Sequence, residues 1–381
     1  MKNFILLISM AISFVNYSQQ GTTITDSIMH DGAYRSYIIY IPVSYSANSA
    51  APLVFNFHGR GSNAIQQYYY GDFRGIADTA GFLVVHPEGT VYQGGTHWNV
   101  GGFVGGSTID DVGFTEALLD TLINQYNINQ SRIYSTGMSN GGYMSLHLAC
   151  FLSSRITAVA SVTGSMTPYT YSMCNPLHPT PVLQIHGTSD PTVPYNGDTW
   201  TQSIDEVVTY WAGHNQCDTN PTISDIPNSN PLDQSTVKKY VYNNGLYGST
   251  VEHFKVIGGG HTWPGFSFGI AGTNYDMDAS IEIWRFFSQY DLNALSSLKE
   301  ISTLEISISP NPFKESFSIS FSKPMYGKYF LLEATGKQLL SNQVAGETQL
   351  NINAKMLDKG IYYVVFYGEQ NELVSHKLIK Q

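Results

Sequence analysis

The sequence contains few charged residues. Asp, Glu, Lys and Arg make up 13% of its 381 residues, well below the share in an average globular protein, and the net charge is −10. A surplus of acidic groups does not neutralise phosphates, so we expect no nucleic acid as a partner. Gly (35 residues) and Tyr (26 residues) fill part of the gap, as they often do in extracellular proteins.

Cysteine is scarce, and metal-binding motifs are missing. The three cysteines, Cys150, Cys174 and Cys217, allow one disulfide and one free thiol in an exported chain, but the sequence does not decide the pairing. The chain has no Cys-x-x-Cys and no His-Glu-x-x-His motif. We therefore expect neither a metal site nor a cofactor.

The sequence has no apolar run of the roughly 18 residues that a transmembrane helix needs. At the start of the chain, Lys2 precedes the short apolar segment Phe4–Val15, and polar residues follow up to Gln20. This pattern predicts a secretory signal peptide over residues 1–20, with cleavage near Ser18.

Residues 21–295 alternate short apolar runs with amphipathic stretches, which predicts an α/β domain with a mostly parallel sheet covered by helices on both faces. The predicted strands are 37–42, 53–57, 82–86, 132–135, 158–162, 182–186 and 252–257. The predicted helices are 111–124, 141–152, 203–211 and 280–290.

The pattern changes after a linker at residues 296–303. Residues 304–381 contain no convincing helix and no set of nucleophile, base and acid, so we expect a small, non-catalytic β-sandwich. Its predicted strands are 316–321, 328–334, 338–342, 348–352, 361–367 and 373–379.

A Gly-x-Ser-x-Gly motif at Gly137–Gly141 lies between a predicted strand and a predicted helix. This context is typical of a nucleophile elbow, in which a sharp turn presents the serine hydroxyl at the edge of a sheet. A second match, Gly265–Gly269, has neither flank and lies in a glycine-rich loop. Ser139 is therefore the predicted nucleophile, rather than Ser267.

The order Ser, Asp, His that accompanies this elbow selects the other two catalytic residues. His261 follows three glycines directly after the strand that ends at Ile257, and it is the predicted base. Asp190 follows the strand 182–186, at the carboxyl end where catalytic groups collect. It would hold the tautomer of the base. Asp198 and Asp205 are alternative acids.

Acyl transfer also needs backbone donors for the developing oxyanion. The predicted donors are the amides of Asn140, next to the nucleophile, and of Arg60, in the glycine-rich loop after the strand 53–57. Trp263, Trp98 and Tyr69 lie in predicted rim loops. Their rings are the candidates for binding a phenolic or sugar ring of a substrate.

Seven segments in order resemble the extracellular polyhydroxybutyrate depolymerase, feruloyl esterase and acetylxylan esterase family. They are Phe57–Ser62, His86–Gly89, Trp98–Asn99, Asp110–Phe114, Gly137–Met144, Ile185–Asp190 and Gly259–Gly265. The resemblance implies an α/β-hydrolase fold and ester hydrolysis through an acyl-enzyme, with Ser139, Asp190 and His261 as the triad. Relatives often carry paired cysteines after the Trp-Asn element, and a cysteine where Arg60 stands.

The tail resembles the C-terminal sorting domain of type IX secretion, on the strength of Ile308–Pro312, Leu357–Tyr363 and the basic end His376–Lys380. This resemblance implies the type IX secretion machinery as a partner. It also implies that the protein is secreted, as an extracellular molecule or one attached to the outer cell surface.

The sequence favours a monomeric carboxylic ester hydrolase that acts on a polymeric or oligomeric ester, namely feruloyl or acetyl groups on plant-wall xylan. A polyhydroxybutyrate depolymerase is the alternative. A serine peptidase is less favoured because there is neither a propeller domain nor an obvious lid. An inert surface-binding protein is less favoured because all three triad positions are filled.

Overall fold

The computed structural model describes residues 21–102, 105–296, 306–333, 338–368 and 373–381. They form two compact units that divide after Ser296. The predicted signal peptide and residues 297–303 of the predicted linker lie outside the described residues. No helix in the described ranges is long and apolar enough to cross a membrane.

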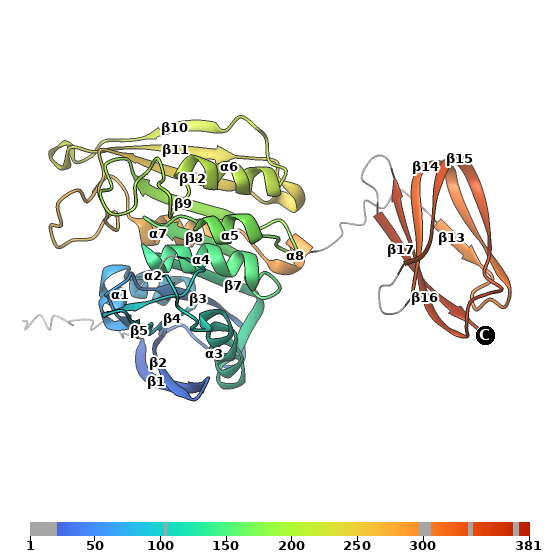
Figure 1. The fold of residues 1–381 in the computed structure, drawn as a ribbon, viewed down its shortest axis with the longest axis horizontal. Coiled ribbons are helices and arrows are strands. Elements are labelled where there is room, and N and C mark those ends of the chain that lie inside the picture. The colour runs from blue at the N-terminus through green and yellow to red at the C-terminus, as the bar shows by residue number, and fades with distance from the viewer. Residues whose placement is uncertain (1–20, 103–104, 297–305, 334–337, 369–372) are drawn as a thin grey trace, which may run out of the picture. The chain divides into compact units, whose positions relative to one another are not determined.

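A ten-stranded sheet forms the centre of the first unit (Figure 1). Its order is β1-β2-β4-β3-β7-β8-β9-β12-β11-β10, and the six strands from β4 to β12 run parallel. The bounds are β1 Thr22–His30, β2 Ala33–Ile41, β3 Ala51–Phe57, β4 Leu83–Pro87, β7 Ile128–Met138, β8 Ala158–Val162, β9 Val182–Gly187, β10 Thr222–Ile226, β11 Thr236–Tyr242 and β12 Val251–Ile257. The predicted parallel sheet is confirmed.

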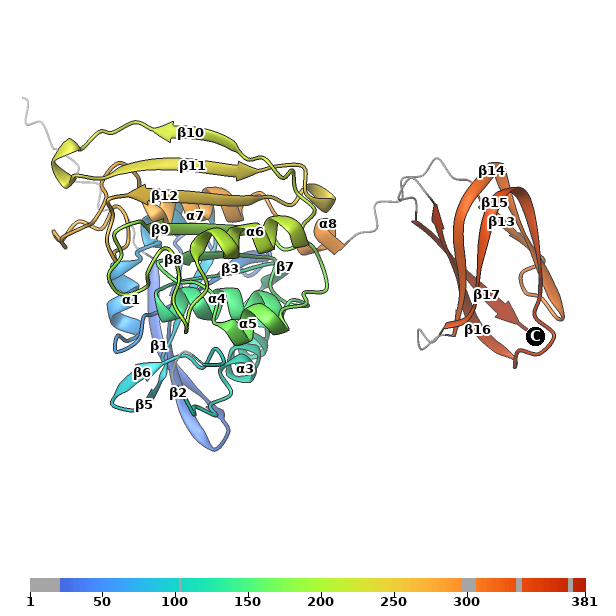
Figure 2. The same cartoon turned by 45° about the horizontal axis from the view of Figure 1, so that its top comes forward.

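Helices cover both faces of this sheet. One core joins it to α3 (Asp111–Gln125), α4 (Asn140–Phe151) and α6 (Ile204–His214), in front of the sheet in Figure 2. A second core joins the other face to α1 (Ala64–Tyr70), α2 (Arg74–Ala80) and α7 (Ala279–Phe287). The remaining elements are the hairpin β5 (Thr90–Tyr92) and β6 (Gly95–His97), α5 (Pro168–Met173), α8 (Leu292–Ser296) and the 3₁₀ turns Pro231–Asp233 and Leu246–Gly248.

The antiparallel edge strands were missed by the sequence analysis. β1 and β10 are exposed over most of their length, so no apolar alternation marks them. They extend a sheet whose central strands are almost entirely buried and therefore apolar.

The second unit is an antiparallel sheet of five strands. They are β13 (Ile306–Ser309), β14 (Ser316–Glu333), β15 (Gln338–Asn353), β16 (Gly360–Gly368) and β17 (Leu373–Lys380). The all-β class is confirmed, but the predicted number of strands is wrong. Two pairs of predicted short strands are merged into β14 and β15, because register shifts after Ser320 let these strands bend without ending.

The disulfide joins Cys150, near the end of α4, to Cys174, directly after α5. Cys217 is a half-buried free thiol. The bridge closes a loop between residues that are 24 positions apart. Such a loop limits the freedom of the unfolded chain and stabilises the folded one.

We expect the double substitution Cys150→Ser and Cys174→Ser to lower the free energy of unfolding by about 3 kcal/mol. Reversible denaturant unfolding of the oxidised protein measures this loss. Cys217→Ser is the matched control, since it removes a thiol without opening a loop. An equal loss in both proteins would show that the bridge contributes nothing beyond side-chain packing.

Candidate active site

Ser139 lies in the tight turn between β7 and α4. Its φ of 54° and ψ of −119° fall in a region that residues other than glycine rarely adopt, and holding it there costs about 1–3 kcal/mol. A Cβ at Gly141 would lie 2.1 Å from the carbonyl oxygen of Phe57, and one at Gly137 would lie 2.5 Å from it. Only glycine at both positions lets the first turn of α4 approach β3 this closely.

Asp190 and His261 are joined by a hydrogen bond from His261 Nδ1 to Asp190 Oδ2, 2.7 Å long. Asp190 follows β9 and His261 follows β12, and these parallel strands are neighbours. Both residues therefore reach the same edge of the sheet. The bond places the imidazole proton on Nδ1, which leaves Nε2 free to accept a proton.

The carboxylate of Asp190 is buried yet favours its charged form. Burial alone would raise its pKa, but the hydrogen bond and charge of His261, together with the amide of Val193, outweigh this effect and lower the pKa. Its Oδ1 accepts hydrogen bonds from the amides of Thr192 and Val193, at 2.8 and 2.9 Å. Asp190 therefore remains an acceptor that orients His261.

The two alternative acids have other roles. Asp205 lies in α6, where its carboxylate accepts a hydrogen bond of 2.7 Å from the hydroxyl of Tyr195. Asp198 accepts a hydrogen bond from the amide of Thr199. The structure thus pairs His261 with the acid that the motif order selected.

Ser139 and His261 line one pocket of about 680 Å³. The other lining residues are Arg60, Gly61, Gln93, Gly94, Gly95, Thr192 and Trp200. Trp200 and the β5–β6 turn were not found by sequence reasoning, because no motif marks them. Trp200 lies ten positions after Asp190, so its place in the loop that carries the acid was the one available signal.

The two predicted oxyanion donors both lie close to Ser139. Asn140 is the first residue of α4, where the helix leaves its amide groups unpaired and the dipole favours negative charge. Arg60 lines the same pocket as Ser139, and a Cβ on the preceding Gly59 would lie 3.4 Å from Ser139 Cβ. Among the described residues, no loop or cap hydrogen bond uses either amide.

Trp98 does not lie at the rim, where it was expected, because its side chain is completely buried. Its indole Nε1 donates a hydrogen bond of 2.9 Å to the carbonyl of His58. Its backbone N–H donates to Asn140 Oδ1 at 2.7 Å, and its carbonyl accepts from Asn140 Nδ2 at 3.1 Å. Trp98 therefore connects the loop that carries Arg60 to the start of α4.

His58 continues this connection toward Arg60. Burial lowers its pKa to about 4, so the ring is neutral. Its Nδ1 donates to the carbonyl of Gly59 at 2.7 Å, and its Nε2 accepts from the amide of Gly89 at 2.9 Å. A buried hydrogen-bond network thus runs from Asn140 through Trp98 and His58 to the residue before Arg60.

Trp263 is also corrected, because only 2% of its surface is exposed. Its Nε1 donates to Ser280 Oγ at 3.2 Å, and its backbone amide donates to the hydroxyl of Tyr70 at 3.0 Å. Trp263 anchors the loop that follows His261 and does not face a substrate. Tyr69 is 56% exposed, but it lines a separate apolar pocket of about 480 Å³.

Two family models match parts of the chain. Residues 110–218 match the phospholipase/carboxylesterase family, and residues 307–381 match the secretion system C-terminal sorting domain. The first unit has the α/β-hydrolase fold. Its likeness to an acetyl xylan esterase from Aspergillus awamori, at a TM-score of 0.50 and 15% identity over 70% of this chain and 99% of that one, shows the fold.

Two curated relatives are named as esterases. A bifunctional acetylxylan esterase/xylanase from Neocallimastix patriciarum is 25% identical over 71% of this chain and 36% of its own length. Feruloyl esterase B from Piromyces equi is 28% identical over 60% of this chain and 42% of its own length. The chain thus spans less than half the length of these two relatives. They support the family that the motifs indicated.

We expect Trp98→Phe to lower kcat on a small ester about tenfold, because it removes the indole hydrogen bond that holds the Arg60 loop. KM should change little, while the affinity for a boronic acid that mimics the transition state should fall in parallel with kcat. Steady-state kinetics and inhibition constants measure both effects.

Trp211→Phe is the matched control, since Trp211 is equally buried but its Nε1 has no hydrogen-bond partner in the part of the chain that the structure describes. It should lower stability without lowering boronate affinity. If the two variants lose kcat and boronate affinity equally, the network has no part in positioning the oxyanion donors.

Proposed function

We propose that this chain is a secreted serine carboxylic ester hydrolase that removes feruloyl or acetyl groups from plant-wall xylan. The observation that carries this proposal is the hydrogen bond from His261 to Asp190, with His261 and the strained Ser139 lining the same pocket. The names of the relatives, which include acetylxylan and feruloyl esterases, support the choice of substrate.

In the proposed reaction, Ser139 Oγ attacks the carbonyl carbon of the ester while His261 Nε2 takes the hydroxyl proton. The amides of Arg60 and Asn140 stabilise the negative charge on the carbonyl oxygen. The bond between the carbonyl carbon and the oxygen of the sugar then breaks. The sugar leaves as an alcohol, with the proton that His261 returns to its oxygen. Water attacks the acyl-enzyme by the same route, releasing the acid and restoring Ser139.

The pocket fits an acyl group carried by a large alcohol. The side chain of His261 is 19% exposed, so the reacting groups are accessible from solvent. Trp200 gives the pocket an aromatic side chain, and Gln93 and Thr192 give it polar ones. We assign substrate binding to Trp200 in place of the buried Trp98 and Trp263.

The second candidate function, hydrolysis of an aliphatic polyester such as polyhydroxybutyrate, is favoured by the apolar pocket that holds Tyr69. Its other lining residues are Ser62, Ile65, Gln66, Tyr70, Phe266 and Ile270. Ser62 directly follows Gly61 of the catalytic pocket. A polyester chain would find an apolar surface beside the reacting groups.

We also propose that the C-terminal unit directs the protein through the type IX secretion machinery. Its match to the sorting-domain family supports this route. The mature esterase would then be released or attached to the outer cell surface.

Product release from three polymers tests the proposed function. The mature enzyme and Ser139→Ala are incubated side by side with feruloylated arabinoxylan, acetylated xylan and amorphous polyhydroxybutyrate. We expect release of ferulate or acetate by the wild type, and a fall of at least about 10³-fold in Ser139→Ala.

Clearing of the polyester alone would favour the second candidate. Full activity of Ser139→Ala in a clean preparation would contradict the catalytic assignment. A fluorophosphonate probe separates an enzyme with another substrate, which still reacts at Ser139, from an inert surface-binding protein, which does not. Matched amide and ester substrates identify a peptidase.

A further inference from the structure

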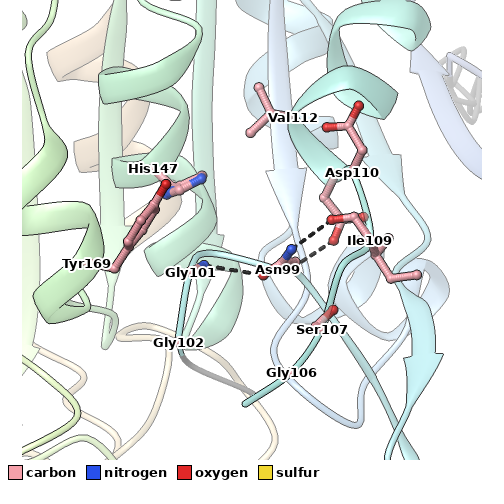
Figure 3. Close-up of a pocket in the computed structure, with 11 residues that line it drawn as sticks. Asn99, Gly101, Gly102, Gly106, Ser107, Ile109, Asp110, Val112, His147 and Tyr169 are labelled. Atoms are coloured by element: carbon pink, nitrogen blue, oxygen red, sulfur yellow. Dashed lines mark hydrogen bonds between the residues drawn. The ribbon is translucent and has the colours of Figure 1, made fainter.

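A second polar pocket lies on the same face of the sheet as α4, outside the catalytic pocket (Figure 3). It has a volume of about 260 Å³. Figure 3 shows Tyr169 and His147 on one side of it, and Asn99, Ile109 and Asp110 on the other. The remaining lining residues are Gly101, Gly102, Gly106, Ser107, Asp111 and Val112.

His147 offers this pocket an unused hydrogen-bond acceptor. The residue is only 7% exposed. We assign the hydroxyl proton of Thr170 to its hydrogen bond with the carbonyl of Val100, and the ring proton of His147 to the bond from Nδ1 to Thr170 Oγ1, 2.8 Å away. The lone pair of the ring is therefore on Nε2, which has no hydrogen-bond partner among the described residues. Burial lowers the pKa of His147 to about 4, which keeps the ring neutral.

Tyr169 adds a flat, half-exposed ring to the wall. Tyr169 is 50% exposed, and its ring stacks on that of Phe151 with 6.1 Å between the ring centroids. Phe151 therefore supports one side of the Tyr169 ring. A Cβ at Gly101 would lie 2.1 Å from the Tyr169 ring. Only glycine at this position lets the loop pass the ring.

The chemistry of these walls selects a neutral ligand with several hydroxyl groups. None of the described residues that line the pocket is a Lys or Arg, and the carboxylate of Asp110, whose side chain is 55% exposed, repels anions. Asp110 Oδ1 already accepts a hydrogen bond of 2.8 Å from the amide of Gly113. The acceptors left for a ligand are therefore Asp110 Oδ2 and the imidazole nitrogen, and both need donors from the ligand. A metal ion would use the acceptors but not the ring of Tyr169. A sugar supplies both hydroxyl donors and an apolar face.

The pocket and the catalytic pocket share no lining residue, but both lie beside α4. His147 lies eight residues after Ser139, with α4 between them, which corresponds to about 12 Å along the helix axis. The chain segment from Gly95, in the catalytic pocket, to Asn99, in this one, links the two on the other side. A polysaccharide whose ester group is bound at Ser139 would span this distance with a few sugar residues.

We propose that this pocket is a sugar-binding subsite for the polysaccharide that carries the ester. Tyr169 would stack on the ring of an unesterified sugar, and His147 Nε2 and Asp110 would accept hydrogen bonds from its hydroxyls. The inference rests on the proposed function for its choice of polysaccharide. It adds that the enzyme recognises the main chain of its substrate at a distance from the scissile bond.

Kinetics on short and long substrates test the subsite. Tyr169→Ala should leave kcat/KM for methyl ferulate or p-nitrophenyl acetate unchanged. It should raise KM for a feruloylated or acetylated xylo-oligosaccharide about tenfold, with kcat unaltered. His147→Phe keeps a ring against Phe151 but removes the acceptor, and should raise the same KM. Tyr34→Ala is the matched control, since Tyr34 is 75% exposed and lies on β2.

Calorimetric titration with an unesterified xylo-oligosaccharide measures binding without catalysis. We expect the wild type and Tyr34→Ala to bind it, and Tyr169→Ala to bind it about tenfold more weakly. Equal affinity in the wild type and Tyr169→Ala, or no binding by the wild type, would overturn the subsite even if ester hydrolysis is confirmed. Binding that depends on Tyr169, without hydrolysis of any polysaccharide ester, would support the subsite and contradict the proposed function.

Discussion

The first turn of α4 packs directly on the end of β3, and the proposed chemistry depends on this contact. With no side chain at Gly137 or Gly141, the backbone of the serine turn reaches the carbonyl of Phe57. The same approach brings the loop after β3, with Arg60, beside Ser139. The proposed nucleophile and both proposed oxyanion donors are thus positioned by one backbone contact, and the network through Trp98 and His58 fixes the donors further.

Burial separates the proposed base from the other histidines near it. It lowers the pKa values of His58, His186 and His253 to about 4, so these rings are neutral hydrogen-bonding groups within the structure. His261 differs because its side chain reaches solvent and is paired with an ionised carboxylate. Of these four histidines, His261 is therefore the one that lines the catalytic pocket with a free Nε2.

The sequence predicted the parallel sheet and the order of the candidate triad because both have local signals. Buried parallel strands are continuous apolar runs, and the elbow at Ser139 has a strand before it and a helix after it. Asp190 and His261 each follow such a strand directly. Their pairing across β9 and β12 then follows from strand order.

Features that depend on contacts between distant parts of the chain could not be predicted from such local signals. Trp98 and Trp263 lie beside catalytic motifs, but the sequence does not show that their rings turn inward to His58 and Ser280. The pairing of Cys150 with Cys174 depends on a Cα separation of 4.8 Å set by α4 and α5. The strand β14 continues through a register shift, where two separate strands, 316–321 and 328–334, were predicted.

A crystal structure of the protein inactivated by an aryl phosphonate ester tests the central claim most directly. The account predicts a covalent bond from phosphorus to Ser139 Oγ, with the phosphonyl oxygen about 3 Å from the amide nitrogens of both Arg60 and Asn140. A phosphonyl oxygen turned away from these amides, or an adduct on a serine other than Ser139, would contradict it.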